Sequence, residues 1–313
     1  MRKSSGTVLK RAIGIAATVI AGMVLTSCFT GIEGTKKINL TKSDKIQLES
    51  EPEEKYLETV VAVPLKDWQK GKRFYVTDQK LAYVMEGSPA DSIRQGTILE
   101  FSGMEKKVYP GGDEGTTLVF STGNEEIKYS VNKPLAKAGE EIMSGNLPMM
   151  IDLDMLGKTS DLLKQRPFWI KTGVWYDEAG NHVKGKKYSK IRITEVEPGN
   201  SSFPIFLHFT SEDGQKGVMM MNFGNGGNES RSFARLFSLT DIRDKYPGIT
   251  DEVWNLIQQS EVRLGMTKEE CRLALGTPSD TNAGHDYSRT LDIWQYPDGR
   301  YLQFADGILV NYR

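Results

Sequence analysis

The chain has 313 residues with a formal net charge of −1, and 26% of its residues are charged. A chain of this length is expected to form more than one domain. Nucleic-acid-binding proteins carry a clustered basic surface, and the balanced charge gives no sign of one, so we expect no nucleic-acid partner.

The N-terminus has the layout of a secretory signal peptide. Four basic residues precede an uncharged run at residues 12–25, and two small residues follow it. As a helix, these about 14 residues would cover roughly 21 Å, which is less than the ~30 Å hydrocarbon core of a membrane. We therefore predict a cleaved signal peptide at residues 1–27 rather than a transmembrane helix.

Residues 25–28 read Leu-Thr-Ser-Cys, which resembles the lipobox of bacterial lipoproteins. The resemblance implies that Cys28 is lipidated and becomes the first residue of the mature chain. Since two acyl chains already give stable attachment, the membrane would be a permanent partner. Phe29 is not the aspartate associated with retention in the inner membrane, and no acidic run follows directly. The implied location is the outer membrane, facing the periplasm. The alternative to a lipobox is an ordinary signal peptide in which Cys28 occurs by chance.

The other cysteine, Cys271, lies in a segment with a helical pattern at residues 268–275. With Cys28 acylated, no intramolecular disulfide is possible. We expect Cys271 to be a small buried apolar residue rather than a nucleophile.

Residues 28–54 are polar and rich in charge, which predicts a flexible tether. From residue 55, short apolar runs alternate with glycine-rich turns. This pattern predicts a small, barrel-like β domain over residues 55–134, with its strand candidates at residues 73–77, 81–84, 96–101, 117–120 and 127–132.

The same pattern recurs about 90 residues later, which indicates a duplication. The recurring strand candidates are residues 167–171, 189–193, 205–209 and 217–222, in a second β domain at 166–224. The connector at 135–165 is predicted to hold a short helix at 159–164. Asp152 and Asp154 alternate there with apolar residues, which favours a solvated strand face over a metal site.

A glycine-rich linker is predicted at residues 225–246, followed by an α+β domain at 247–313. Thr250 can cap one helix, and Thr267 with Glu270 can form a capping box on the next. Three strands, at 290–296, 300–304 and 308–312, are joined by turns that contain Asp-Gly. The expected unit is α-α-β-β-β.

This C-terminal domain resembles the SmpA/OmlA (BamE-like) lipoprotein domain. The resemblance implies a two-helix, three-stranded fold that makes protein contacts in the cell envelope and has no enzymatic activity. Members of that family consist of little besides this domain, whereas here a long sequence precedes it. We therefore do not assign the family's binding partners to this chain. The matching residues are Gly265, Met266, Thr267, Gly276, Pro278, Trp294, Tyr296, Phe304 and Gly307.

Other candidate chemistry is sparse. Trp175 and Tyr176 fall near a loop, where exposed aromatic rings can bind glycans or proteins. The favoured interpretation is that such rings fill the ends of the small barrels, and Trp175 and Tyr176 are kept as candidate binding residues. Residues 180–186 follow most of a phosphate-loop pattern, but a lysine replaces the magnesium-binding hydroxyl and a strand follows, so a hairpin tip is favoured. The three histidines have no metal-like spacing. We expect no catalytic residues, metal or cofactor.

These features predict a mainly β chain with two small barrel-like repeats and a C-terminal α+β domain. The predicted function is that of a membrane-anchored, non-enzymatic envelope lipoprotein that binds or assembles proteins. The alternative is a lipoprotein that binds cell-wall glycans.

Overall fold

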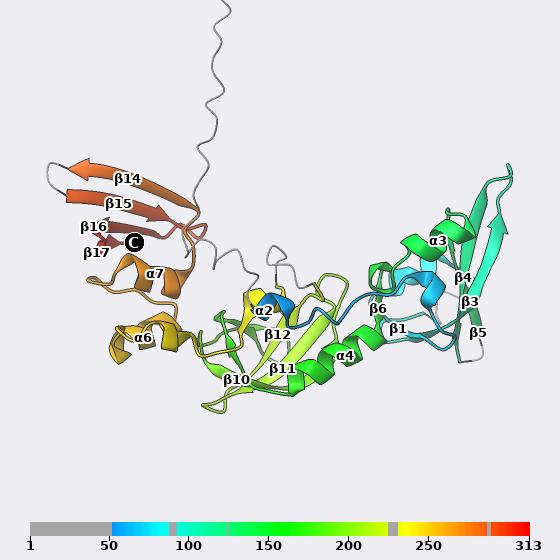
Figure 1. Ribbon diagram of the computed structural model, residues 1–313, viewed down its shortest axis with the longest axis horizontal. Coiled ribbons are helices and arrows are strands. Elements are labelled where there is room, and N and C mark those ends of the chain that lie inside the picture. Colours follow the sequence, from blue (N-terminus) through cyan, green and yellow to red (C-terminus); the bar gives the residue numbers. More distant parts are fainter. Residues whose placement is uncertain (1–51, 88–92, 124, 225–230, 287–288) are drawn as a thin grey trace, which may run out of the picture. The chain divides into compact units, whose positions relative to one another are not determined.

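The computed structural model describes residues 52–87, 93–123, 125–224, 231–286 and 289–313. Within these ranges the fold is mainly β, as predicted, with three antiparallel sheets of six, seven and four strands and a few short helices (Figure 1). The two larger sheets are curled half-barrels rather than the barrel-like domains expected. Each is an open sheet with two edge strands.

The six-stranded sheet has the order β2-β5-β4-β3-β1-β6. Its aromatic core contains Trp68, Phe74, Phe101 and Phe120, whose rings meet edge-on or tilted. The short helices associated with it are η1 (Leu65–Asp67), η2 (Gln79–Tyr83), α3 (Leu135–Glu141) and η3 (Ser144–Asn146). The strands are β1 (Arg73–Val76), β2 (Met85–Glu86), β3 (Ile98–Val108), β4 (Glu114–Thr122), β5 (Glu125–Val131) and β6 (Met150–Asp152).

The seven-stranded sheet has the order β13-β7-β10-β11-β12-β8-β9. Helices α2 (Pro52–Lys55), α4 (Leu153–Lys164) and α5 (Phe233–Leu236) accompany it. Its strands are β7 (Phe168–Ile170), β8 (Val174–Tyr176), β9 (His182–Lys184), β10 (Lys190–Pro198), β11 (Ile205–Ser211), β12 (Lys216–Met221) and β13 (Phe237–Ser238).

The two larger sheets share one strand order. The run β2-β5-β4-β3-β1-β6 in the first matches β8-β12-β11-β10-β7-β13 in the second. Register agrees as well, because Leu99 lies opposite Phe74 as Ile191 lies opposite Phe168. Both β3 and β10 carry a bulge just after these positions. The strands that correspond in the sequence repeat therefore also occupy equivalent positions in the two sheets.

The hydrophobic cores do not follow the expected domain boundaries. Leu57 and Val60, near the start of the first predicted repeat, belong to the core of the second sheet. Glu53, expected in the flexible tether, is buried and accepts a hydrogen bond from the backbone N–H of Leu239. Residues 233–238, expected in a linker, form α5 and β13 because three large apolar side chains there are buried: Phe233, Leu236 and Phe237.

The connector also differs from its prediction. Helix α4 begins at Leu153, well before residue 159, because the Asp152 carboxylate caps it by accepting the backbone N–H groups of Asp154 and Met155. The expectation that Asp152 lies on a solvated strand face was wrong, since only 1% of its surface is exposed. The alternation with apolar residues came from a buried strand running into a helix.

The C-terminal unit contains η4 (Ile242–Lys245), α6 (Asp251–Gln258), α7 (Lys268–Leu275) and a sheet of β14 (Asp280–Asp286), β15 (Arg289–Gln295), β16 (Tyr301–Ala305) and β17 (Ile308–Tyr312). Three strands were expected and four are present. Strand β14 escaped prediction because its sequence, DTNAGHD, consists mostly of residue types that are depleted in strands, such as Asp, Asn, Ala and Gly. None of the helices in the described ranges is both long enough and apolar enough to span a membrane.

Candidate binding surface

The C-terminal sheet has one face covered by helices. The capping box predicted for α7 is present: the Thr267 side chain accepts from the Glu270 backbone, and the Glu270 carboxylate accepts from the Thr267 backbone. These caps fix the helix start, and α6 and α7 lie together beside the sheet (Figure 1). Between helices and sheet lies a single core that includes Trp254, Ile257 and the motif residue Met266.

The remaining large motif residues fill this core. Trp294 packs 4.7 Å from Phe304, centroid to centroid, and the Arg272 guanidinium lies 5.0 Å from the Trp294 ring. The Tyr296 hydroxyl donates a hydrogen bond to the Gly276 carbonyl at the end of α7. Burial raises the pKa of Tyr296 to about 12. These contacts bind the sheet to α7, so the motif residues support the fold.

The small motif residues shape the turns. Gly265 and Gly276 have φ values of 91° and 86°, a region that favours glycine. Asp306 and Gly307 both have positive φ and close the β16–β17 hairpin. Pro278 follows the C-terminus of α7, where the helix cannot continue.

Cys271 lies on the inner face of α7 and is fully buried, as predicted. Burial raises the pKa of its thiol to about 12. A thiol with such a pKa is protonated at neutral pH and is a poor nucleophile. Cys271 therefore contributes packing.

The opposite face of the sheet is uncovered by any described element. Side chains alternate between the two faces of a strand, so the neighbours of buried Trp294 and Leu309 point outward. Ile293, Ile308 and Val310 are 37%, 41% and 46% exposed. Leu291 pairs with Ala305, and Ala305 with Ile308, which carries the apolar surface across three strands. We call these six residues the outer sheet face: Leu291, Ile293, Ala305, Ile308, Val310 and Tyr301.

The surroundings of the outer sheet face make it a possible docking surface. A hollow of about 360 Å³ lies at its β15–β16 end, lined by Ile293, Arg300 and Tyr301 among others. The edge of β17 that faces away from β16 is covered, because the backbone there forms hydrogen bonds with residues 265–268. Strand β14 forms the other edge and pairs with β15 alone. The surface thus combines an apolar row, formed by Leu291, Ala305 and Ile308, with the polar side chain of Gln303, which lies opposite Ile293, and protein interfaces likewise contain both apolar and polar groups.

The aromatic pair singled out in the sequence is divided by the structure. Of the two roles considered for Trp175, the structure shows core filling, because the side chain is fully buried against Phe209 and its indole N–H donates to the Thr172 carbonyl. Gly185 lies directly over its ring. Tyr176 remains half-buried, with the Arg231 guanidinium 5.9 Å from its ring centroid. A ligand can reach Tyr176 but not Trp175.

The other residues considered for chemistry are placed as follows. Residues 180–186 lie at the tip of the β8–β9 hairpin and its end, as predicted. His208 faces the outside of β11, with Nε2 3.0 Å from the Glu197 carboxylate. It borders a hollow of about 640 Å³ that also contains Asp177, Glu178 and Glu195. Across the described ranges, no three His, Cys, Asp or Glu side chains gather closely enough to hold a metal ion.

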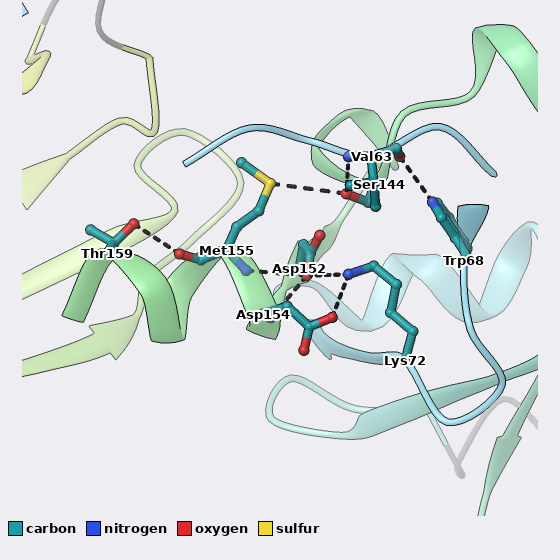
Figure 2. A network of polar contacts seen from close by, with 8 residues as sticks. All are labelled: Val63, Trp68, Lys72, Ser144, Asp152, Asp154, Met155 and Thr159. Atoms are coloured by element: carbon teal, nitrogen blue, oxygen red, sulfur yellow. Dashed lines mark hydrogen bonds and ion pairs between the residues drawn. The ribbon is translucent and has the colours of Figure 1, made fainter. Parts of the chain in front are cut away.

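Sequence reasoning missed the buried polar network around Lys72 (Figure 2). The Lys72 ammonium lies 2.8 Å from Asp152 Oδ1 and 2.6 Å from Asp154 Oδ2. Lys72 and Asp152 are both buried, whereas Asp154 is half exposed. Lys72 precedes β1 in a polar stretch of sequence, so only the non-local pairing of β1 with β6 brings the three charges together.

Cys28, the predicted lipidation site, lies outside the described residues. Comparison of the chain with protein-family models, with curated proteins and with solved structures gives no match.

Proposed function

We propose that this chain is a lipid-anchored, non-enzymatic module of the bacterial cell envelope that binds a protein through the outer sheet face. The observation that carries the proposal is the uncovered apolar surface over β15, β16 and β17. Exposed contiguous apolar surfaces on soluble domains mark interaction sites. Burial of such surface contributes about 25 cal/mol per Å², which favours association.

The shape of the surface supports a protein partner over a small molecule. Small ligands bind in enclosed pockets, whereas Leu291, Ala305 and Ile308 form a row across three neighbouring strands. Arg300 and Tyr301 at the adjoining hollow are residue types enriched at protein–protein hot spots.

The resemblance to the SmpA/OmlA (BamE-like) domain supports the same proposal. Two capped helices on one face of an antiparallel sheet agree with that fold, and strand β14 is an addition to the expected three strands. The partner we propose is accordingly another envelope protein. The lipobox supports anchoring through Cys28, and the residue after it supports the outer membrane facing the periplasm.

The proposal is tested by affinity purification of the intact protein from envelope extracts. We expect the wild type to enrich an envelope protein that the Ile293→Lys, Ile308→Lys variant recovers at least tenfold less. The matched control, Asn255→Lys with Gln259→Lys, adds the same two charges at an exposed position of α6 and at its exposed C-cap residue. Equal recovery by both variants would argue against the outer sheet face as the binding surface.

A further inference from the structure

Strand β14 is the longest sheet edge in the described ranges (Figure 1). The edges of the two larger sheets are β2, β6, β9 and β13, which contain only two or three residues each. The edge of β17 is covered by residues 265–268. By contrast, β14 has seven residues and pairs with β15 alone. An uncovered edge of this length can add a further strand.

The edge of β14 lacks the features that usually prevent such pairing, which are lysine, proline and β-bulges. Its sequence is Asp-Thr-Asn-Ala-Gly-His-Asp, with neither lysine nor proline. Its pairing with β15 shows no register shift, so the strand contains no bulge. Residues 280–284 are all exposed. A partner strand can therefore reach this edge.

The hydrogen bonds of β15 show which backbone groups of β14 face outward. Tyr296 donates its N–H to the Arg300 carbonyl, and Asp306 donates its N–H to the Thr290 carbonyl. Hydrogen-bonded and non-bonded pairs alternate along an antiparallel ladder. The even-numbered residues of β15 therefore bond to β16, and the odd-numbered ones bond to β14.

Asn282 and Gly284 lie opposite odd-numbered residues of β15 and bond to them. Thr281 and Ala283 lie between these positions, so their N–H and C=O groups point away from the sheet. An extended segment of polypeptide has the matching spacing of donors and acceptors, which makes it the class of ligand that this edge fits.

Gly284 indicates which side chain the segment brings to the outer sheet face. Gly284 lies opposite Leu291, at the end of the apolar row that continues through Ala305 and Ile308. A Cβ atom added to Gly284 would meet nothing within 4 Å, so there is open space between Leu291 and the edge. An aromatic side chain on the neighbouring strand stabilises a sheet at such an edge glycine.

Asp280 adds a requirement for charge. It is exposed and lies on the same face of β14 as Gly284, four residues earlier. Opposite charges on neighbouring strands stabilise their pairing, which favours lysine or arginine opposite Asp280. A second copy of residues 280–284 would bring neither a basic nor a large apolar side chain, so a different segment fits better.

We propose that an extended segment of the bound protein pairs with β14 in antiparallel orientation. Its backbone bonds to Thr281 and Ala283, an apolar residue lies opposite Gly284, and a basic residue four positions later lies opposite Asp280. The proposal rests on the proposed function, because the segment belongs to the protein that the outer sheet face binds.

The test uses the full chain in detergent solution and the peptide acetyl-Thr-Phe-Thr-Val-Thr-Lys-Thr-amide, whose phenylalanine and lysine match Gly284 and Asp280. Amide exchange is followed by NMR. We expect saturable binding and at least tenfold slower exchange of the Thr281 and Ala283 amides. The amides of Asn282 and Gly284 already bond to β15 and should change little.

The matched control is the same peptide with N-methyl groups on the two threonines that flank the valine. It keeps every side chain but cannot donate to Thr281 and Ala283, so its Kd should be at least tenfold higher. An unchanged Kd, unchanged exchange at both amides, or no saturable binding would overturn the proposal. So would protection of both amides in a dimer of the chain without peptide, which would make a second copy the occupant.

Ala283→Pro separates this proposal from the proposed function. Proline is tolerated at an edge position whose N–H faces solvent, and it removes the outward donor. Affinity purification should then recover at least tenfold less envelope protein. Full recovery by Ala283→Pro, with loss in the Ile293→Lys, Ile308→Lys variant, would overturn the strand pairing alone. The reverse result would support the pairing and count against the outer sheet face. The peptide experiment uses the unaltered chain, so it decides the question if Ala283→Pro does not fold.

Discussion

The ammonium group of Lys72 is held between two carboxylates, and Asp152, one of its partners, also caps a helix. Two interactions thus depend on one buried carboxylate. Taking charged groups out of water costs free energy, and removal of one partner leaves the other charge uncompensated. The pair therefore fixes where β6 ends and α4 begins more than it adds net stability.

Lys72→Met is expected to destabilise the first sheet by about 3–5 kcal/mol, because Asp152 would remain buried without its counter-charge. Lys66→Met is the control, since Lys66 pairs with Glu140 at the surface and its loss should cost less than about 1 kcal/mol. Hydrogen exchange of β1 and β6 under denaturant measures both. Equal effects would show that burial of the Lys72 pair has no energetic consequence.

Lys187 should make stability depend on pH. Burial lowers its pKa to about 8, and its Nζ atom donates to the Ala274 carbonyl at 2.6 Å. Below pH 8 the lysine is charged in the folded and unfolded states, so the desolvation cost is fully present. Between pH 8 and the unfolded value of 10.5 only the unfolded state stays protonated, and stability rises with pH.

We therefore expect the wild type to gain stability relative to Lys187→Met as pH increases from 8 to 10, by at most about 1.4 kcal/mol per pH unit. Burial raises the pKa of Tyr188 to about 12. Because Tyr188 is present in both proteins, its contribution to the pH dependence cancels in the difference between them. Urea unfolding monitored by exchange of α7 measures the difference. A constant difference across this pH range would contradict the assignment.

At the scale of single residues, the sequence predicted those whose role is local. The Thr267–Glu270 capping box and the burial of Cys271 follow from short patterns, and both are present. Asp152 was placed at the surface and the position of Trp175 was left between two alternatives, because their burial depends on partners far along the chain, Lys72 and Phe209. Sequence spacing carries no information about such contacts.

A glycine in helix α4 and a glycine next to the β8–β9 hairpin have opposite effects on the stability of the fold. Gly157 lies exposed within α4, and a Cβ atom added there would meet nothing within 4 Å. A Cβ atom on Gly185 would lie 2.0 Å from Cδ2 of buried Trp175. The first glycine only weakens its helix, whereas the second makes room for a core side chain.

Gly157→Ala should therefore stabilise the protein by about 0.5–1 kcal/mol. Gly185→Ala should destabilise it by about 1–3 kcal/mol or more, because Trp175 must move. The free energy of unfolding of the second sheet, followed by Trp175 fluorescence and by exchange in β11, measures both. Effects of the same sign would contradict the packing described for Gly185.

Elements with strong periodicity were predicted, and short or polar ones were not. The strands β3, β10 and β11 contain alternating buried residues, and β4 contains a continuous apolar run, which are the two patterns that predict strands. Strands β6 and β13 contain only three and two residues, and each forms by pairing with a strand distant in sequence. Strand β14 is polar and depends on its hairpin with β15. Local propensity cannot identify such strands.

For the whole molecule, the matching strand orders of the two larger sheets suggest duplication of one structural unit. The C-terminal unit has its own core, and it carries the apolar surface on which the proposed function depends. We propose that the lipid anchor keeps that surface at the membrane, close to its partner.

Cys28→Ser should release the protein from the membrane, because the thiol that accepts the lipid is lost and two acyl chains are what make attachment stable. Cys271→Ala is the control, since it also removes a thiol but should leave the protein in the membrane fraction. Fractionation followed by immunoblotting measures both. Retention of Cys28→Ser in the membrane would argue against lipid anchoring.

The most direct test of the binding proposal is site-specific photo-cross-linking in intact cells. A photoreactive side chain at Ile293 should form an adduct with an envelope protein, and Ile308→Lys should reduce its yield at least tenfold. The same side chain at Gln259, the exposed C-cap residue of α6, should not form that adduct. An identical adduct pattern from both positions, or no adduct from Ile293 in correctly located protein, would contradict binding through the outer sheet face.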